Sequence, residues 1–110
     1  MTKNTGWVIA GCLLLTQLVH ADEINDERVL FVELERADCT ANDGKLIALE
    51  NVDPEKTMVV WVDRWLMGVQ TTDQVKYELL PRQEPTPLGC SMTKDGDQHW
   101  TVSSTEAVSP

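Results

Sequence analysis

The chain has 110 residues, of which 18 are acidic and nine are lysine or arginine, so its formal net charge at pH 7 is −9. The basic residues are scattered singly and form no cationic stripe that could neutralise phosphates, which argues against nucleic acid and an anionic membrane surface as partners. This length indicates a single domain.

The first 21 residues have the layout of a secretory signal. Lys3 precedes the apolar run 7–19, and Val19 and Ala21 supply a cleavage site. The run is shorter than the roughly 20 residues that a spanning helix needs. We therefore expect a signal peptide over 1–21, a mature chain that begins at Asp22, and a periplasmic or secreted protein without a membrane segment.

A second interpretation of the N-terminus involves Cys12. Residues 9–12, Ile-Ala-Gly-Cys, resemble the box of a bacterial lipoprotein, in which the cysteine is acylated. The apolar run before Cys12 is very short, however, and another apolar segment would follow the anchor. Cleavage after Ala21 is therefore favoured over lipidation of Cys12.

The cysteines of the mature chain predict a disulfide bond. Without residues 1–21, the chain has 89 residues, eight of them basic and 18 acidic, and a formal charge of −10. A core of this size is marginal and gains from a covalent link. Two cysteines remain, Cys39 and Cys90, and an oxidising compartment favours their pairing. A zinc site fits less well, because it needs about four ligands and His99 is the one remaining histidine.

The N-terminal half of the mature chain is expected to form strands. Residues 22–28 are an acidic lead with almost nothing apolar, which we expect to be flexible. A single β domain is expected over 29–104, beginning with strands at 29–35 and 45–51, where apolar residues recur with a period of two. Turn signals follow at Asp43-Gly44 and at Pro54.

The strongest strand candidate covers 57–65. Alternation places one set of apolar residues on one face (Met58, Val60 and Val62) and a second set on the other (Val59, Trp61, Asp63 and Trp65). The density of β-branched and aromatic residues favours a strand over a helix. Gly68 is expected to end or bend this segment, and 63–74 is the main place where a helical turn could form.

The C-terminal half continues the pattern. A strand at 75–80 brings Val75, Tyr77 and Leu79 to one face, and 105–110 is expected to be a polar tail. Three prolines, Pro81, Pro85 and Pro87, lack the N–H of a ladder hydrogen bond and indicate a crossing or an edge strand. Asp95-Gly96 is a hairpin signal, after which Trp100 and Val102 are expected to point inward.

The fold class predicted by these short strands is all-β, a small sandwich or a small barrel held by the disulfide. The immunoglobulin sandwich is an analogy at the level of the fold only. Trp61 lies 22 residues after Cys39, which is far for the packing usual there, and no tyrosine stands two residues before Cys90.

The sequence predicts no catalytic residue, metal or cofactor, and hence no enzyme. Asp97, His99 and Ser103 share one face of a strand, and a flat row lacks the cleft and oxyanion donors of a triad. The acidic turns at Asp43 and Asp95 lack a complete calcium-loop pattern. Asp63 is the least ordinary acid, since two tryptophans flank it, and a salt bridge with Arg64 or another base is the favoured explanation.

Residues 61–67 are the candidate partner-binding segment. They combine types enriched at interface hot spots: Trp61, Arg64, Trp65, Leu66 and Met67. The competing interpretation is that Trp61 and Trp65 fill the sandwich. The predicted function is a small exported non-catalytic binding module of a bacterial envelope, an inhibitor or accessory protein acting on a basic protein partner. An acidic structural or calcium-dependent component is one alternative, and a small hydrolase is another.

Overall fold

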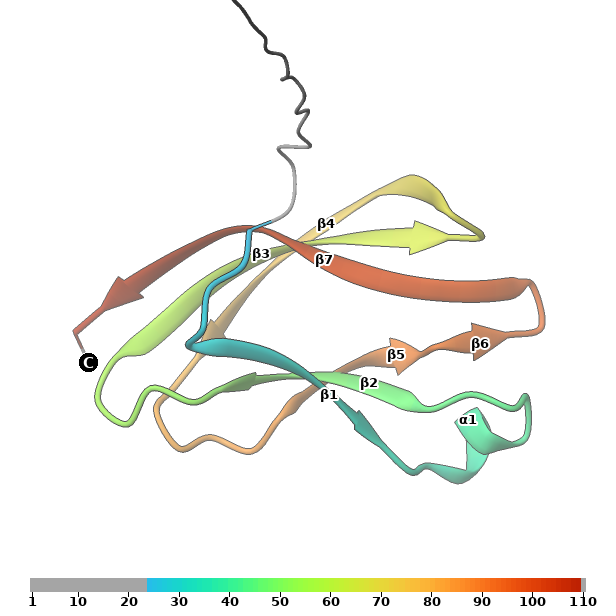
Figure 1. Cartoon of the computed structure of the whole chain (residues 1–110), viewed down its shortest axis with the longest axis horizontal. Helices are drawn as coiled ribbons and strands as arrows, with labels where there is room; N and C mark the ends of the chain where they lie inside the picture. Colours follow the sequence, from blue (N-terminus) through green and yellow to red (C-terminus); the bar gives the residue numbers. More distant parts are fainter. Residues whose placement is uncertain (1–23, 110) are drawn as a thin grey trace, which may run out of the picture.

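The structure is a computed structural model that describes residues 24–109, which form two antiparallel sheets packed face to face (Figure 1). The three-stranded sheet has the order β1 (Val29–Leu34), β2 (Leu46–Asn51) and β5 (Thr86–Cys90). The four-stranded sheet has the order β4 (Val69–Leu79), β3 (Thr57–Leu66), β7 (Gly96–Val108) and β6 (Met92–Thr93). The predicted all-β, disulfide-stapled sandwich is confirmed. The predicted signal peptide and Cys12 lie outside the described residues.

The core lies between the sheets and is centred on β3. The three residues that alternation placed on one face of β3, Met58, Val60 and Val62, are all buried there. Neighbouring strands and the opposite sheet complete the cluster with Val29, Leu49, Leu79 and Val102. Strand β3 has β4 on one side and β7 on the other, and Val29 and Leu49 of the opposite sheet pack against its inward face.

The segment 63–74, where a helical turn was considered, is instead a hairpin. Leu66 pairs with Val69 across a two-residue turn, and both turn residues, Met67 and Gly68, have positive φ. This is the backbone that two-residue hairpins prefer, because its twist matches that of the strands. Strand β4 therefore begins at Val69, well before the predicted strand at 75–80.

The only helix in the described part of the chain is one turn long. Helix α1 (Ala37–Thr40) lies in the connection between β1 and β2, where no helix was predicted. No helix among residues 24–109 is long and apolar enough to cross a membrane.

Both ends of the domain form more hydrogen bonds with the rest of the fold than the sequence predicts. Strand β7 continues to Val108 and pairs with the start of β3, so most of the predicted polar tail is strand. The described part of the acidic lead runs beside β7, where the Ile24 N–H donates to the carbonyl of Val102 (2.7 Å) and the Thr105 hydroxyl donates to Asp26 (2.7 Å). Expected to be flexible, this lead is hydrogen-bonded to the last strand.

The proline-rich stretch carries the chain from the four-stranded to the three-stranded sheet, as a crossing followed by an edge strand. At its start, the buried Asn51 side chain donates to the carbonyls of Leu79 and Lys56, each at 2.9 Å. Strand β5 then runs along the edge of its sheet with Pro87 opposite Ala48. The missing N–H of a proline is tolerated at an edge.

The predicted disulfide is present between Cys39 and Cys90, with a Cα–Cα distance of 5.2 Å. It joins α1 to the end of β5, so it ties the edge of the three-stranded sheet to that sheet's own β1–β2 connection. In an immunoglobulin domain the bond links the two sheets and a core tryptophan packs on it. Here it does not link the sheets, so the analogy is limited to the two-layer architecture.

Candidate functional site

The five residues of the candidate partner-binding segment do not lie on one surface. Trp61 and Trp65 are on the outer face of the four-stranded sheet, opposite the core residues of β3. Arg64 and Leu66 alternate to the inner side, where Arg64 lines a pocket between the sheets. Met67 is in the β3–β4 turn and is 64% exposed. The structure therefore divides the segment between two faces and a turn.

The outer face carries an aromatic cluster that we call the tryptophan face, formed by Trp61, Trp65 and His99. The Trp65 and His99 rings stack with centroids 5.6 Å apart and planes inclined by 11°. The indole N–H of Trp65 donates to the hydroxyl of Thr101 at 2.9 Å. Trp61 is 37% exposed. The interpretation in which Trp61 and Trp65 fill the sandwich is therefore wrong, because the aliphatic side of β3 occupies that space.

A carboxylate lies between the two tryptophans. Asp63 is only 4% exposed, and its Oδ1 accepts a hydrogen bond of 2.9 Å from the Gln74 amide on β4. The expected salt bridge with Arg64 or another base is wrong: within residues 24–109 Asp63 pairs with no basic side chain, and Arg64 points to the other side of the sheet, where it pairs with Asp73 at 2.8 Å. Alternation along the strand explains why sequence neighbours do not meet.

Charged side chains border the tryptophan face. The Lys76 ammonium lies 5.8 Å from the centroid of a Trp61 ring, a cation–π contact. Two strand positions further along, Val59 pairs with Glu78 on β4 and with Glu106 on β7. Paired residues share a face of the sheet, so two carboxylates lie on either side of the same apolar residue. The face thus has an acidic end at Glu78 and Glu106.

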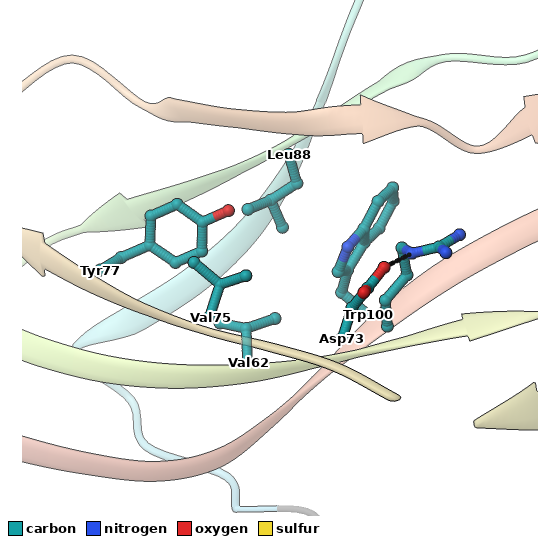
Figure 2. Close-up of a pocket in the computed structure, with 7 residues that line it drawn as sticks. Val62, Asp73, Val75, Tyr77, Leu88 and Trp100 are labelled. Carbon is teal, nitrogen blue, oxygen red and sulfur yellow. Dashed lines mark hydrogen bonds and ion pairs between the residues drawn. The ribbon is translucent and has the colours of Figure 1, made fainter. Parts of the chain in front are cut away.

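On the opposite side of the same sheet is a half-open pocket of about 150 Å³ between the two sheets, which we call the inter-sheet pocket (Figure 2). Its apolar wall consists of Val62, Val75, Leu88 and Trp100. Tyr77 stands at one end and the Arg64–Asp73 ion pair at the other. Burial raises the pKa of the Tyr77 phenol, so the hydroxyl stays neutral at physiological pH.

The polar end of the pocket is tied to both sheets. Besides Asp73, the Arg64 guanidinium donates to the Gln98 side-chain oxygen at 2.9 Å. The Gln98 amide in turn donates to the backbone carbonyl of Cys90 at 2.7 Å. This series connects β4, β3, β7 and β5 and ends at the disulfide. The orientation of Arg64 is therefore set by the fold.

The pocket was not predicted from the sequence, although the directions of some of its lining residues were. The shared face of Val75 and Tyr77 was predicted, as was the inward direction of Trp100. Asp73 continues the face of Val75 and Tyr77, but the predicted strand began only at 75. Leu88 is the extra residue of a bulge, where simple alternation gives no direction.

Two residues considered from the sequence as parts of a triad make other contacts in the structure. The His99 ring stacks on Trp65, and the Ser103 hydroxyl donates to the backbone carbonyl of Trp61 at 3.3 Å. Within residues 24–109, the one group of three potential metal ligands is Asp38 with the two cysteines, which are already joined to each other. The acidic turns at Asp43 and Asp95 do not belong to it.

The disulfide bears on the compartment of the protein, and comparisons with known proteins bear on its family. A disulfide of this kind indicates an oxidising compartment outside the cytoplasm. Neither the protein-family models nor the curated proteins and solved structures contain a match to this chain.

Proposed function

We propose that this protein is a small, exported, non-catalytic binding module of the bacterial envelope, periplasmic or secreted, and that it binds a basic protein partner through the tryptophan face. The observation that carries the proposal is the position of Trp61 and Trp65 on the outer face of a sheet, where they contribute nothing to the inter-sheet core. Tryptophan is among the residues that dominate binding energy at protein interfaces.

The geometry of the face suits a rigid protein surface. Trp61 and Trp65 are four residues apart on one strand, which separates their Cα atoms by about 13 Å at the rise of a β-strand. Hydrogen bonding to Thr101 and stacking on His99 hold Trp65 in place. An ordered aromatic side chain loses little conformational entropy when a partner covers it, so more of the contact energy appears as affinity.

The charges favour a basic partner. The expected mature chain carries a formal charge of −10. Glu78 and Glu106 form the acidic end of the tryptophan face, where cationic side chains of a partner would be attracted. Charge complementarity of this kind speeds association, and salt reduces it over a Debye length of about 8 Å at physiological ionic strength.

The experiment is a comparison of binding by folded variants. Immobilised wild-type protein is used to isolate partners from periplasmic extract, and the recovered protein is then measured by surface plasmon resonance. Trp61→Ala is expected to raise the dissociation rate about 30-fold, the effect of losing a hot spot of about 2 kcal/mol. Glu78→Gln with Glu106→Gln is expected to lower the association rate.

Val69→Ala is the matched control, because Val69 is an exposed apolar residue of β4 that pairs with Leu66 and so lies on the side of the sheet opposite the tryptophans. It is expected to leave both rates unchanged. If the folded Trp61→Ala protein binds with unchanged kinetics, the tryptophan face is not the interface. If every recovered partner is acidic, the electrostatic part of the proposal is wrong.

A further inference from the structure

The inter-sheet pocket is a second surface feature that the proposed function does not use. It lies on the inner side of the four-stranded sheet, so the sheet itself separates it from the tryptophan face. Figure 2 shows Val62 and Val75 below, Leu88 above and the Trp100 ring to one side. The pocket is half open, and Val75 in its wall is 46% exposed, so a space of about 150 Å³ with four apolar side chains is accessible from solvent.

Two residues of the pocket lie at irregularities in the strand pairing. On β5, Gly89 pairs with Ile47 and Pro87 with Ala48, which leaves Leu88 as the extra residue of a bulge. On β4, the pairing passes from Gln74 opposite Asp63 to Gln70 opposite Trp65, and Asp73 lies within that shift while it continues the face of Val75 and Tyr77. Bulges are frequent beside functional sites.

Two polar groups of the pocket lining have no hydrogen bond to another residue among those that the structure describes, the Tyr77 hydroxyl and the indole N–H of Trp100. The Tyr77 hydroxyl points toward the pocket in Figure 2. The Arg64 guanidinium, by contrast, donates to both Asp73 and Gln98. The hydroxyl can therefore donate one hydrogen bond to a guest and accept another.

The lining restricts the chemical class of that guest. A cavity of this volume with apolar walls has room for one benzene-sized ring. The indole of Trp100 provides a flat surface against which such a ring can stack. The guanidinium of Arg64 is already neutralised by Asp73, so an anion finds no free positive charge. A cation would lose its hydration against valine and leucine without a dedicated counter-charge.

We propose that the inter-sheet pocket binds a small neutral aromatic molecule with one hydroxyl group, with its ring against Trp100 and Val75 and its hydroxyl bonded to Tyr77. Such pockets, mostly apolar with a few placed polar groups, are the usual form of small-molecule sites. A phenol has few atoms, so binding in the high micromolar to millimolar range is expected.

The test is an NMR titration of the disulfide-bonded protein with phenol, toluene, benzoate and benzylamine. Phenol is expected to shift the amide signals of 62, 75, 77, 88 and 100 in a saturable manner, and toluene to shift the same signals with weaker affinity. Benzoate and benzylamine are expected to bind at least tenfold more weakly than phenol. Linear, unsaturated shifts with phenol, or shifts confined to the tryptophan face, would overturn the proposal.

Variants separate the ring site from the hydroxyl contact. Tyr77→Phe removes only the hydroxyl and is expected to weaken phenol about fivefold, the effect of one hydrogen bond, while toluene is unaffected. Val75→Phe is expected to fill the pocket and abolish both interactions. Val69→Phe, at the start of the same strand and outside the pocket lining, is the control and is expected to change neither.

Folding of each variant is checked by its amide spectrum. If Val75→Phe fails to fold, Leu88→Phe fills the same space from the other sheet. Retention of phenol binding in a folded pocket-filling variant would exclude this site. Equal weakening of phenol and toluene by Tyr77→Phe would exclude the hydroxyl contact. Neither result depends on whether the tryptophan face binds a protein.

Discussion

Trp65 and His99 lie nearly parallel on the outer face of the four-stranded sheet, with their ring centroids 5.6 Å apart. They are directly opposite each other on β3 and β7, in a pair that the strand register sets. The stack therefore connects two strands on the side that faces away from the core. A residue in this position has a different energetic role from a core residue on the same strand.

The first prediction follows from that difference. Trp65→Ala removes a stack and one hydrogen bond, so we expect the free energy of unfolding to fall by about 1–2 kcal/mol. Met58→Ala, on the inner face of the same strand, is expected to lower it by about 3 kcal/mol, because it leaves a cavity. Urea unfolding monitored by circular dichroism measures both. Equal losses would mean that Trp65 belongs to the core.

The second prediction concerns the disulfide. Cys39→Ser is expected to lower the free energy of unfolding by about 2–5 kcal/mol, because the unfolded chain regains the entropy of an open loop. Cys39→Ser with Cys90→Ser should lose a similar amount, since one bond is removed in both cases. Denaturant unfolding under non-reducing conditions measures this. Two reactive thiols in the unfolded, unreduced wild-type protein would contradict the pairing.

The third prediction concerns acid stability at the N-terminal lead. Hydrogen bonds from the side chain and backbone N–H of Arg28, and from the Thr105 hydroxyl, hold the pKa of Asp26 well below its ordinary value. A carboxyl whose pKa is lowered by folding stabilises the protein above its unfolded pKa of about 3.9, and this contribution is lost as the pH falls toward the folded pKa.

Asp26→Asn is therefore expected to lower the free energy of unfolding by about 1–2 kcal/mol at pH 7, with a difference from wild type that shrinks below about pH 4. Asp38→Asn is the control. Asp38 also pairs with an arginine two residues away, but both partners are exposed, so a much smaller change is expected. Urea unfolding from pH 2 to pH 7 gives the comparison. A loss for Asp26→Asn that is independent of pH would refute the assignment.

The fourth prediction concerns the β3–β4 turn, where Met67 has a φ of 51°. This left-handed conformation costs about 1–2 kcal/mol for most side chains, and asparagine followed by glycine is the preferred pair for such a turn. Met67→Asn is expected to raise the free energy of unfolding by about 1 kcal/mol. Gly68→Ala, at φ 80° with open space around the added methyl, should lower it by about the same amount. Thermal unfolding measures both changes. The Met67 side chain lies against Gly96. If Met67→Asn lowers the stability, the loss of that contact is larger than the gain from the relieved backbone conformation.

The sequence alone was sufficient for the fold class, the main strands and the disulfide. Met58, Val60 and Val62 alternate in a segment too rich in β-branched and aromatic residues for a helix, and burial followed that alternation. The bond between Cys39 and Cys90 followed from their number and expected compartment. The crossing at 81–87 followed from the missing N–H groups of proline. Each of these inferences depends on properties of the residues themselves and of their immediate neighbours.

Tertiary structure decided what covers each face. Alternation separates Trp61 and Trp65 from Met58 and Val60, but it does not tell which face meets the second sheet, and the size of the tryptophans favoured them as core. The bulge at Leu88 depends on the pairing of β5 with β2, a strand distant in sequence. The pairing of Arg64 with Asp73 rather than Asp63, and the bonding of the acidic lead to β7, likewise required partners that only the folded chain brings together. The local pattern determines on which side of its own strand a residue lies, whereas long-range packing determines whether that side is core, pocket or surface.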